Sequence, residues 1–286
     1  MLVERKYIPS KGDIIYHYCS AETFNLICTN KKLRFTDIFS MNDFMELQWG
    51  YHQWIKVANE YVDTLKYDFI DKIDSIIHES SLHCLPLAVC FSESGDVLSQ
   101  WRAYADDGEG YAIGFDANLL IQLSINPLKI SYDEDEQKDE IIKFIDKSYE
   151  LEGKEDEKNE VNLTSTCMEF AFDLCAFKNP SFSEEKEIRL THLLNFEESN
   201  NSSRLVDNGG TAFGREHFGD KISFFMRKSA PVTFIDMDYT DKNLINPIRE
   251  VILGPKNHTL ETAISIYLET LGIPSVDVSR SRASYR

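Results

Sequence analysis

Hydrophobic and polar positions follow two different spacings along this chain, and each spacing predicts one type of element. Short apolar runs without Gly or Pro predict strands. Apolar residues that recur every three to five positions predict helices, the longest of them over residues 42–83. Strands are predicted at 14–18, 33–35, 85–93, 110–116, 126–133, 185–194, 221–227, 231–238, 248–255 and 274–281, and further helices at 96–106, 170–177 and 260–271. With no repeat and no long linker, this mixture predicts a single α+β domain over residues 1–286.

A charged segment at about residues 133–165 interrupts the pattern. It is mostly acidic, and Ile141, Phe144 and Ile145 within it have helical spacing. The stretch EGKEDEKNE that follows has the composition of a solvated loop. We interpret the segment as a charged helical excursion from the domain with a solvated tip.

The stretch from Ile14 to Phe35 combines a strand, a helix start and a histidine. Residues 14–18 suit a short strand, and Ser20 is expected to cap the helix that follows. His17 therefore lies at a strand end just before a helix N-terminus, where ligand-binding groups often collect. The alternative is a histidine whose hydrogen bonds are satisfied inside the core.

Charge and cysteine usage narrow the class of protein. The formal net charge of −18 opposes binding to a phosphate backbone, although it leaves room for a local basic pocket. Six cysteines occur without a CxxC pair, so we expect free thiols and no zinc site. No apolar run is long enough to cross a membrane, and the N-terminus has no apolar leader. These features predict a soluble cytoplasmic protein without a metal.

Two carboxylates and a guanidinium recur at a period of two near the sequence EEKEIRL. On a strand, Glu185, Glu187 and Arg189 point to one face, while Ile188 and Leu190 point to the core. Arg189 is placed to neutralise one carboxylate and to hold it in position. The alternative is a solvated face of the sheet.

A second group of residues lies in CFSESGDVLSQWRAYA. The strand, the turn and the helix expected here leave Ser92 and Glu93 near the helix start, with Asp96 as the expected N-cap. Trp101 and Tyr104 are three residues apart on that helix and are placed to sandwich a flat ring, or else to pack in the core. The Rossmann, P-loop, GxSxG and HExxH motifs are absent.

Taken in order, several motifs resemble a bacterial family known as domain of unknown function 2971. They are YHYCS with LRF, NDFME, CFSE with QWRAYAD and GYAIGFD, EEKEIRL, IREVILGP and the terminal SRSRASYR. The resemblance extends over nearly the whole chain. Arg102 departs from the usual pattern, and the acidic excursion is longer than typical. The family name implies no activity.

A more remote resemblance does imply one. HYCSAETFNLICTNKKLRF is similar to the first motif of ADP-ribosyltransferases of the His-Tyr-Glu type, and AVCFSE to GYAIGFD is similar to the segment that lines their nicotinamide pocket. The resemblance implies a split mixed or antiparallel sheet with flanking helices and NAD as the substrate. The one departure in the middle motif is that Cys90 and Phe91 stand where a strand tyrosine is expected.

Carried over residue by residue, the resemblance implies specific roles. His17 would hydrogen-bond the adenosine ribose of NAD with Ser20 nearby, and Tyr104, or else Trp101, would stack on nicotinamide. Glu187 would hold the 2′-hydroxyl of the nicotinamide ribose and favour the oxocarbenium-like state. Ser92 and Arg189 complete the expected nucleotide site.

Three classes of function stay open at this point. The first is an NAD-dependent ADP-ribosyltransferase or NAD-cleaving effector, in toxin action or phage defence, whose acceptor is a protein or a nucleic acid. The second is a non-catalytic nucleotide- or protein-binding module on the same fold. The third is a nuclease built on the carboxylate pairs Asp43 with Glu46 and Glu185 with Glu187, although their spacing does not demand two metals.

Overall fold

The computed structural model describes most of the 286-residue chain. The residues outside the description are 1–4, 41–43, 63–64, 66, 153–161, 213–214, 241–244 and 286, and the side chains of 44–47, 67, 81 and 215 are not described either. The tip of the acidic excursion therefore lies outside the described residues, as do Asn42 and Asp43 of the predicted helix start. The same holds for the side chain of Glu46.

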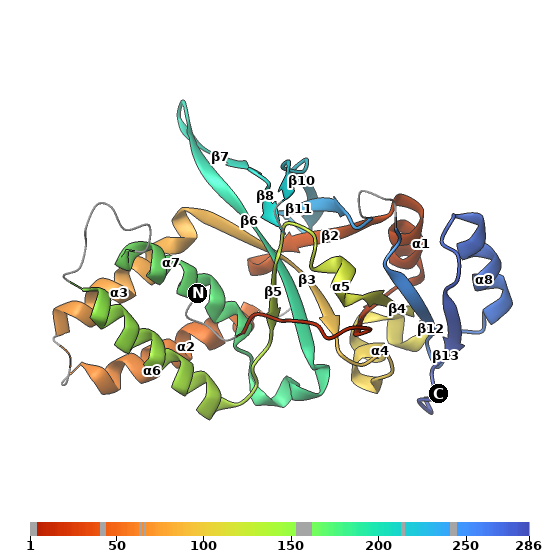
Figure 1. Ribbon diagram of the computed structural model, residues 1–286, viewed down its shortest axis with the longest axis horizontal. Coiled ribbons are helices and arrows are strands. Elements are labelled where there is room, and N and C mark those ends of the chain that lie inside the picture. The colour runs from red at the N-terminus through yellow and green to blue at the C-terminus, as the bar shows by residue number, and fades with distance from the viewer. Residues whose placement is uncertain are drawn as a thin grey trace.

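A mixed sheet of eleven strands forms the centre of the molecule (Figure 1). Its main path runs β10-β11-β2-β3-β1-β4-β12-β13, and β5, β6 and β7 extend from the other edge of β3. Only β12 and β13 pair in parallel among these described strands, so the sheet is mostly antiparallel. The bounds are β1 Ile14–Cys19, β2 Lys32–Asp37, β3 Cys84–Ser92, β4 Tyr111–Asp116, β5 Asn126–Lys129, β6 Glu187–Ser199, β7 Ser202–Val206, β10 Ser223–Arg227, β11 Ala230–Asp238, β12 Ile248–Leu253 and β13 Asp277–Arg280. Strands β8 (Gly210–Ala212) and β9 (Arg215–His217) form a separate hairpin.

The sheet splits along one edge of β3. On its other edge β3 pairs with β6 over its whole length. On the split edge, β2 pairs only with Leu87 and Ala88, and β1 pairs only at Ser92. Residues 89–91 of β3 therefore have none of the described strands beside them on this edge, because β1 and β2 diverge there. The α+β class, the mixed sheet and its split are confirmed.

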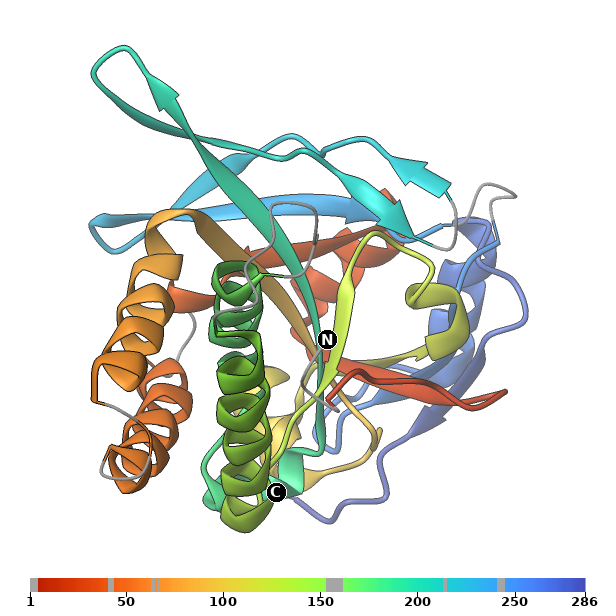
Figure 2. The same cartoon turned by 60° about the vertical axis from the view of Figure 1, so that its left-hand side comes forward.

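The two largest hydrophobic cores are separate: one lies against the sheet and the other lies between helices. Helices α1 (Ala21–Asn30) and α8 (Glu261–Thr270) bury Phe24, Ile27 and Leu268 against the strands. A second core joins α2 (Phe44–Tyr61), α3 (Tyr67–Glu79), α6 (Glu134–Leu151) and α7 (Leu163–Asp173), which form the helical end of the molecule in Figures 1 and 2. In it the rings of Phe144 and Phe170 stack with centroids 3.7 Å apart.

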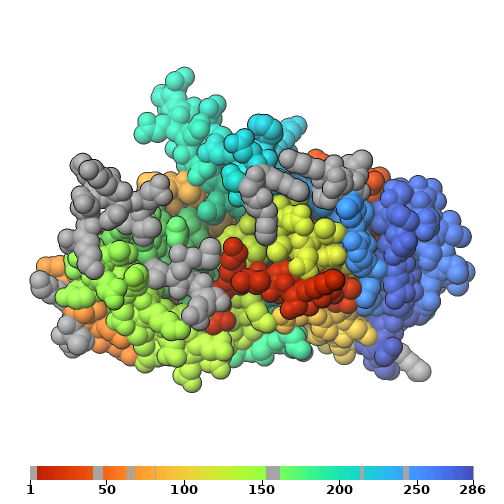
Figure 3. Space-filling model, in the orientation of Figure 1, coloured from red at the N-terminus to blue at the C-terminus, as the bar shows by residue number. Residues whose placement is uncertain are grey.

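Short elements connect these layers. They are α4 (Leu98–Tyr104), α5 (Ala117–Leu120) and the 3-10 helices η1 (Ile38–Ser40), η2 (Ser80–Leu82), η3 (Asp106–Gly108), η4 (Leu174–Ala176) and η5 (Pro180–Glu185). The N-terminal segment crosses the face shown in Figure 3, where Tyr7 N donates to Pro127 O at 2.9 Å. The β6–β7 hairpin projects from the body of the molecule (Figures 1 and 2).

Most predicted elements are confirmed, and two elements and one helix cap are corrected. The helix predicted over 42–83 is two helices, α2 and α3, and both bury their stripes in the same core, so the periodicity continues across the break. The expected cap Asp96 does not cap α4, whose N-cap is Val97. Instead, Asp96 accepts hydrogen bonds from Trp101 Nε1 and Arg282 N, both at 2.7 Å. The strand predicted from Glu185 begins at Glu187, because Glu185 ends η5.

The acidic excursion belongs to the helical core. Helix α6 is capped by Asp133 and α7 by Asn162, through side-chain bonds to the first backbone N–H groups of each helix. Ile141 and Ile145 are buried there beside the stacked Phe144. The described part of the excursion therefore packs against α2 and α3 through its apolar face, and its acidic residues are exposed apart from Glu140, which is buried and paired with Arg5.

Candidate active site

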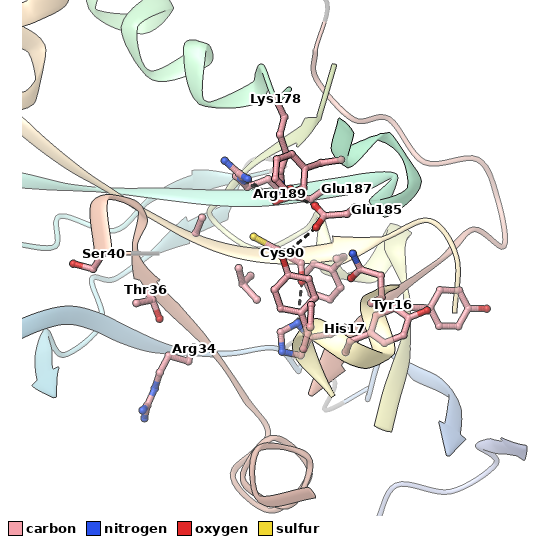
Figure 4. Close-up of a pocket in the computed structure, with 18 of the residues that line it drawn as sticks. Tyr16, His17, Arg34, Thr36, Ser40, Cys90, Lys178, Glu185, Glu187 and Arg189 are labelled. Atoms are coloured by element: carbon pink, nitrogen blue, oxygen red, sulfur yellow. Dashed lines mark hydrogen bonds and ion pairs between the residues drawn. The ribbon is translucent and has the colours of Figure 1, made fainter. Parts of the chain in front are cut away.

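A cavity of about 700 Å³ opens where the sheet splits (Figure 4). Strands β1, β2 and β3 supply its floor, because β1 and β2 diverge over residues 89–91. Helix α4, the 3-10 helix η5, β6 and β10 supply its walls. The side chains that line it and carry chemistry are Tyr16, His17, Arg34, Cys90, Gln100, Tyr104, Lys178, Glu185, Glu187, Arg189 and Arg227. A volume of this size matches cavities that bind small molecules.

One wall of the cavity is a chain of four buried charges. Lys178 Nζ lies 2.5 Å from Glu185 Oε2 and 3.1 Å from Glu187 Oε2, so it bridges the two carboxylates. Arg189 donates to Glu187 Oε1 through Nε at 2.8 Å and Nη2 at 2.7 Å, and to Cys175 O through Nη1 at 2.9 Å. Figure 4 shows these four charged side chains grouped together, opposite Arg34, Thr36 and Ser40. We call them the carboxylate wall.

The carboxylate wall follows from local chain geometry. Glu187 and Arg189 share one face of β6 because they are two residues apart. Glu185 is brought beside them by Lys186, whose φ of 44° turns the chain between η5 and β6. Ser92 Oγ donates to the Glu185 carbonyl at 2.7 Å and holds this turn against β3.

Burial decides between the two interpretations of this wall. Glu187 is 4% exposed and Arg189 2% exposed, and Glu185 is also buried. A solvated face is therefore wrong, and the predicted orientation of Ile188 and Leu190 into the core is confirmed. Charges removed from water are retained only when they are paired, as they are here.

The two carboxyl groups have pKa values displaced in opposite directions. Burial alone would raise the pKa of Glu187, but Arg189, Lys178 and a hydrogen bond from Cys90 together lower it to about 2. Burial raises the pKa of Glu185 above its ordinary value, although Lys178 partly offsets this. Glu187 is therefore ionised throughout the physiological range, while Glu185 holds a proton more readily. Neighbouring groups with such opposed protonation are typical of acid–base sites.

His17 fills the split in the sheet. Its Nδ1 lies 2.9 Å from Cys90 O, and a carbonyl only accepts, so Nδ1 donates the hydrogen bond. This bond satisfies a β3 carbonyl on the edge where no strand is present. Burial lowers the pKa of His17, so the ring is neutral at pH 7 and Nε2 carries a lone pair. Within the described part of the chain no side chain bonds this Nε2, which belongs to the cavity lining.

The side chains of the two aromatic residues of α4 point to different sides of the helix: one lines the cavity and the other is buried. Tyr104 lines the cavity, is 41% exposed and donates from its OH to Glu185 Oε1 at 3.1 Å. Burial and Glu185 raise its pKa, so the phenol keeps its proton. Trp101 is fully buried and packs edge-on against Tyr18, with ring centroids 4.8 Å apart. Its role is therefore core packing, the second of the two alternatives for this pair.

Of the predicted site residues, four come together and three do not. His17, Tyr104, Glu187 and Arg189 all line the one cavity. Ser20 caps α1, where its Oγ accepts from Thr23 N at 3.1 Å. Ser92 is buried behind the carboxylate wall, and Trp101 faces the core, so neither lines the cavity.

Several cavity residues were missed by sequence reasoning. Lys178 is a single lysine nine positions from Glu187, and no periodicity marks it. Arg34 lies on β2, where it forms two 2.8 Å hydrogen bonds to Asp236. Arg227 lies on β10 and donates to Ser40 O. The sequence signal found only one of the four cavity cations, Arg189, because Lys178, Arg34 and Arg227 lie outside the charged motif EEKEIRL.

The thiols and other chemical features complete the description. All six cysteines are free, as predicted. Cys90 lines the cavity, but burial raises its pKa well above the ordinary value, so it is a protonated thiol. Among the described residues, no group of three or more His, Cys, Asp or Glu is placed to hold a metal ion. In the same part of the chain, every helix is too short or too polar to cross a membrane.

These features define an α+β protein with a ligand-sized cavity and an ionised carboxylate at a sheet split. Residues 100–190 match the model of a family described as "Protein of unknown function (DUF2971)", which supports the resemblance to that family. No curated protein and no solved structure matches the chain. The matched segment contains Tyr104 and the whole carboxylate wall, whereas His17 lies outside it. The resemblance to ADP-ribosyltransferases stays a prediction.

Proposed function

We propose that this protein cleaves the nicotinamide glycosidic bond of NAD and transfers ADP-ribose to an acceptor. The observation that carries the proposal is the carboxylate wall, in which an ionised Glu187 and a more basic Glu185 face the same cavity as His17. Bond cleavage develops positive charge on the ribose, and a fixed carboxylate stabilises this charge more in the transition state than in the ground state.

Each step of the proposed reaction has a cavity side chain suited to it. The bond from ribose C1′ to the pyridinium nitrogen breaks, and its electron pair leaves with nicotinamide as a neutral molecule. The nucleophile of the acceptor, or water, then bonds to C1′ and loses its proton to Glu185, whose raised pKa suits a base. Tyr104 orients Glu185 through the 3.1 Å hydrogen bond.

The rest of the cavity suits a dinucleotide. The lone pair on His17 Nε2 would accept from a ribose hydroxyl. Arg227 lines the cavity away from the carboxylate wall and supplies positive charge for phosphate groups, in a chain whose net charge is −18, while Arg34 on the same side is paired with Asp236. A cavity-lining cation in an acidic protein favours an anionic ligand.

A second candidate is a nucleotide-binding module without catalysis. It is favoured by the pairing of Glu187 with both Arg189 and Lys178, because these cations offset the carboxylate's field. Such a module would bind NAD and release no nicotinamide.

The two candidates are separated by one set of measurements. The purified protein is incubated with NAD, free nicotinamide is quantified by mass spectrometry, and NAD binding is measured by calorimetry. Glu185→Gln and Tyr104→Phe should release nicotinamide more slowly, and Glu197→Gln is the control for loss of a carboxylate, because Glu197 lies on β6 outside the cavity. Binding without release, with and without cell lysate, would select the non-catalytic module, and absence of binding would reject both.

A further inference from the structure

The C-terminal segment that follows β13 lies beside helix α4 (Figure 1). Ser281 Oγ donates to Asp96 Oδ1 at 2.5 Å and Arg282 N donates to Asp96 Oδ2 at 2.7 Å, so two consecutive residues bind the carboxylate that precedes α4. Ser281 Oγ also accepts from Ala283 N at 3.0 Å, which fixes the turn of the segment at this point. The motif SRSRASYR, which contributes nothing to the cavity lining, is therefore anchored at the start of α4.

The same segment binds the chain just after α4. Tyr285 OH donates to Asp107 Oδ1 at 2.7 Å, and Lys256 Nζ donates to Asp107 Oδ2 at 2.7 Å. The Lys256 ammonium also lies 4.1 Å from the centre of the Tyr285 ring. Asp107 has a φ of 51°, in the left-handed region, so these contacts help to hold an uncommon backbone conformation. Residues 281–285 therefore contact the chain on both sides of α4, and we call them the C-terminal strap.

Helix α4 depends on support from outside itself. It has seven residues, and an isolated helix of this length is not stable in water. Its N-cap, Val97, makes no side-chain cap bond. One flank borders the cavity, where Gln100, Ala103 and Tyr104 line open space. The helix is therefore positioned by the contacts of its buried side, around Trp101, and of its two ends.

Asp96 connects the strap to the buried side of the helix. Besides the two bonds from the strap, its Oδ1 accepts from Trp101 Nε1 at 2.7 Å. Trp101 is fully buried in a small core that contains Ala105, and Ala283 of the strap packs against this core. Ala105 directly follows Tyr104 in the chain. The strap, the indole and the end of the helix therefore form one connected set of contacts that fixes where Tyr104 leaves α4.

We propose that the C-terminal strap positions α4, and that Asp96 is the positioning residue through which the strap holds the Tyr104 hydroxyl on Glu185. The effect on nicotinamide release rests on the proposed function, while the placement of Tyr104 does not. Tyr104 OH lies 3.1 Å from Glu185 Oε1, which is long for a hydrogen bond between two oxygens, so a small shift of α4 would break it. A loosened strap would then free Glu185 from its orienting hydroxyl while the rest of the cavity stays in place.

The first test observes Tyr104 directly and needs no turnover. In the full chain, the tyrosines are labelled with ¹³C at Cζ, and the NMR signal that Tyr104→Phe removes is that of Tyr104. Asp96→Asn and Ser281→Ala should each shift this signal in the direction that Glu185→Ala shifts it, because all three changes weaken the same hydrogen bond. Ser284→Ala is the matched control, since Ser284 is an exposed serine of the same strap, and it should leave the signal in place. A Tyr104 signal that does not move in either Asp96→Asn or Ser281→Ala would overturn the proposal.

The second test asks whether the strap acts on the reaction through Tyr104. Ser281→Ala should slow nicotinamide release about three- to tenfold, and no more than Tyr104→Phe does. NAD affinity by calorimetry should not change, because Ser281 does not line the cavity. In a chain that already carries Tyr104→Phe, Ser281→Ala should cost nothing further, and Ser281→Thr, which keeps the hydroxyl, should restore the wild-type rate. A further loss in the Tyr104→Phe chain, a weakened NAD affinity or a slow Ser281→Thr variant would each contradict a positioning role.

The strap and the proposed function can fail separately. A wild type that releases no nicotinamide, but whose Tyr104 signal moves in Asp96→Asn and Ser281→Ala, would reject NAD cleavage and keep the strap as the device that places Tyr104. A wild type that releases nicotinamide at a rate unchanged by Ser281→Ala, with the Tyr104 signal in place, would keep NAD cleavage and reject the strap.

Discussion

Replacing Glu187 by Gln should destabilise the fold in a way that depends on pH. The structure gives the magnitude, because the pKa of this buried carboxyl falls from an ordinary 4.5 to about 2 when Arg189 and Lys178 surround it. Each pKa unit corresponds to about 1.4 kcal/mol of free energy, so the charged form of Glu187 contributes about 3 kcal/mol to stability at pH 7. The loss of one partner from a buried ion pair typically costs about 3–5 kcal/mol, which agrees.

The sign of the pH dependence follows from the lowered pKa. A carboxyl whose folded-state pKa is depressed stabilises the fold at any pH above the unfolded value of 4.5. This contribution is lost as the pH falls toward 2, and about 1.4 kcal/mol of it remains at pH 3. The difference between wild type and Glu187→Gln should therefore be constant from pH 8 to pH 6 and should shrink below pH 5.

Urea unfolding followed by tryptophan fluorescence measures this difference. Glu197→Gln is the matched control, since Glu197 lies on the same strand in an exposed pair with Arg204, and it should change the free energy of unfolding by less than about 1 kcal/mol. Glu185→Gln should cost less than Glu187→Gln, because burial already disfavours the charged form of Glu185. A loss below about 1 kcal/mol for Glu187→Gln at pH 7, or a difference that stays constant down to pH 3, would refute the pairing described here.

Three further changes have expected outcomes. Tyr104→Phe removes the 3.1 Å bond to Glu185 and, if NAD is cleaved, should slow nicotinamide release about tenfold or more with little change in NAD affinity by calorimetry. His17→Ala should lower the free energy of unfolding by about 1–3 kcal/mol, because Cys90 O then lacks its donor, and urea unfolding beside a His258→Ala control, which changes an exposed histidine, would show whether the loss is particular to the split. His192 donates through both ring nitrogens, to Ser124 O and to Asp207 at 2.9 Å, and the bond to Asp207 helps to raise its pKa although burial opposes this. The protonated His192 therefore stabilises the fold fully below pH 6.5, and this contribution is lost as the pH rises through the raised pKa. The free energies of unfolding of wild type and His192→Gln should converge at high pH, and a difference that does not change with pH would contradict the assignment.

Periodicity predicted the elements better than their boundaries. The period of two correctly predicted a shared direction for Glu187 and Arg189, because that property depends only on the strand, whereas Glu185 lies outside the strand and reaches the same wall through the turn at Lys186. It did not predict burial, which depends on Lys178 and on the turn at Lys186. Those contacts come from tertiary packing, and a solvated face has the same sequence pattern.

The helices show a different limit of prediction from sequence periodicity. A stripe of apolar residues predicts that a helix packs against a core, but it does not say which core or where the helix turns back. Helices α2 and α3 pack in the same core, so the apolar spacing of the two helices resembles that of one long helix. In α4, Trp101 and Tyr104 lie on neighbouring turns as expected, yet Asp96 draws the Trp101 indole N–H to the buried side while Tyr104 reaches the cavity at the helix end.

The split of the sheet explains why the position of His17 is compatible with both interpretations that its sequence context allowed. A histidine has two nitrogens, and the two interpretations concern different ones. Nδ1 completes the backbone hydrogen bonding of β3 at the position where β1 and β2 separate, which is a structural role. The same bond fixes the tautomer, so Nε2 of this cavity-lining residue keeps the lone pair that a ligand hydroxyl needs under the proposed function. Because the gap between strands creates both the unsatisfied carbonyl and the cavity, one side chain placed there can serve the fold and the proposed site together. A residue that only packed there would leave Cys90 O without a donor, and one that only bound ligand would have no fixed orientation.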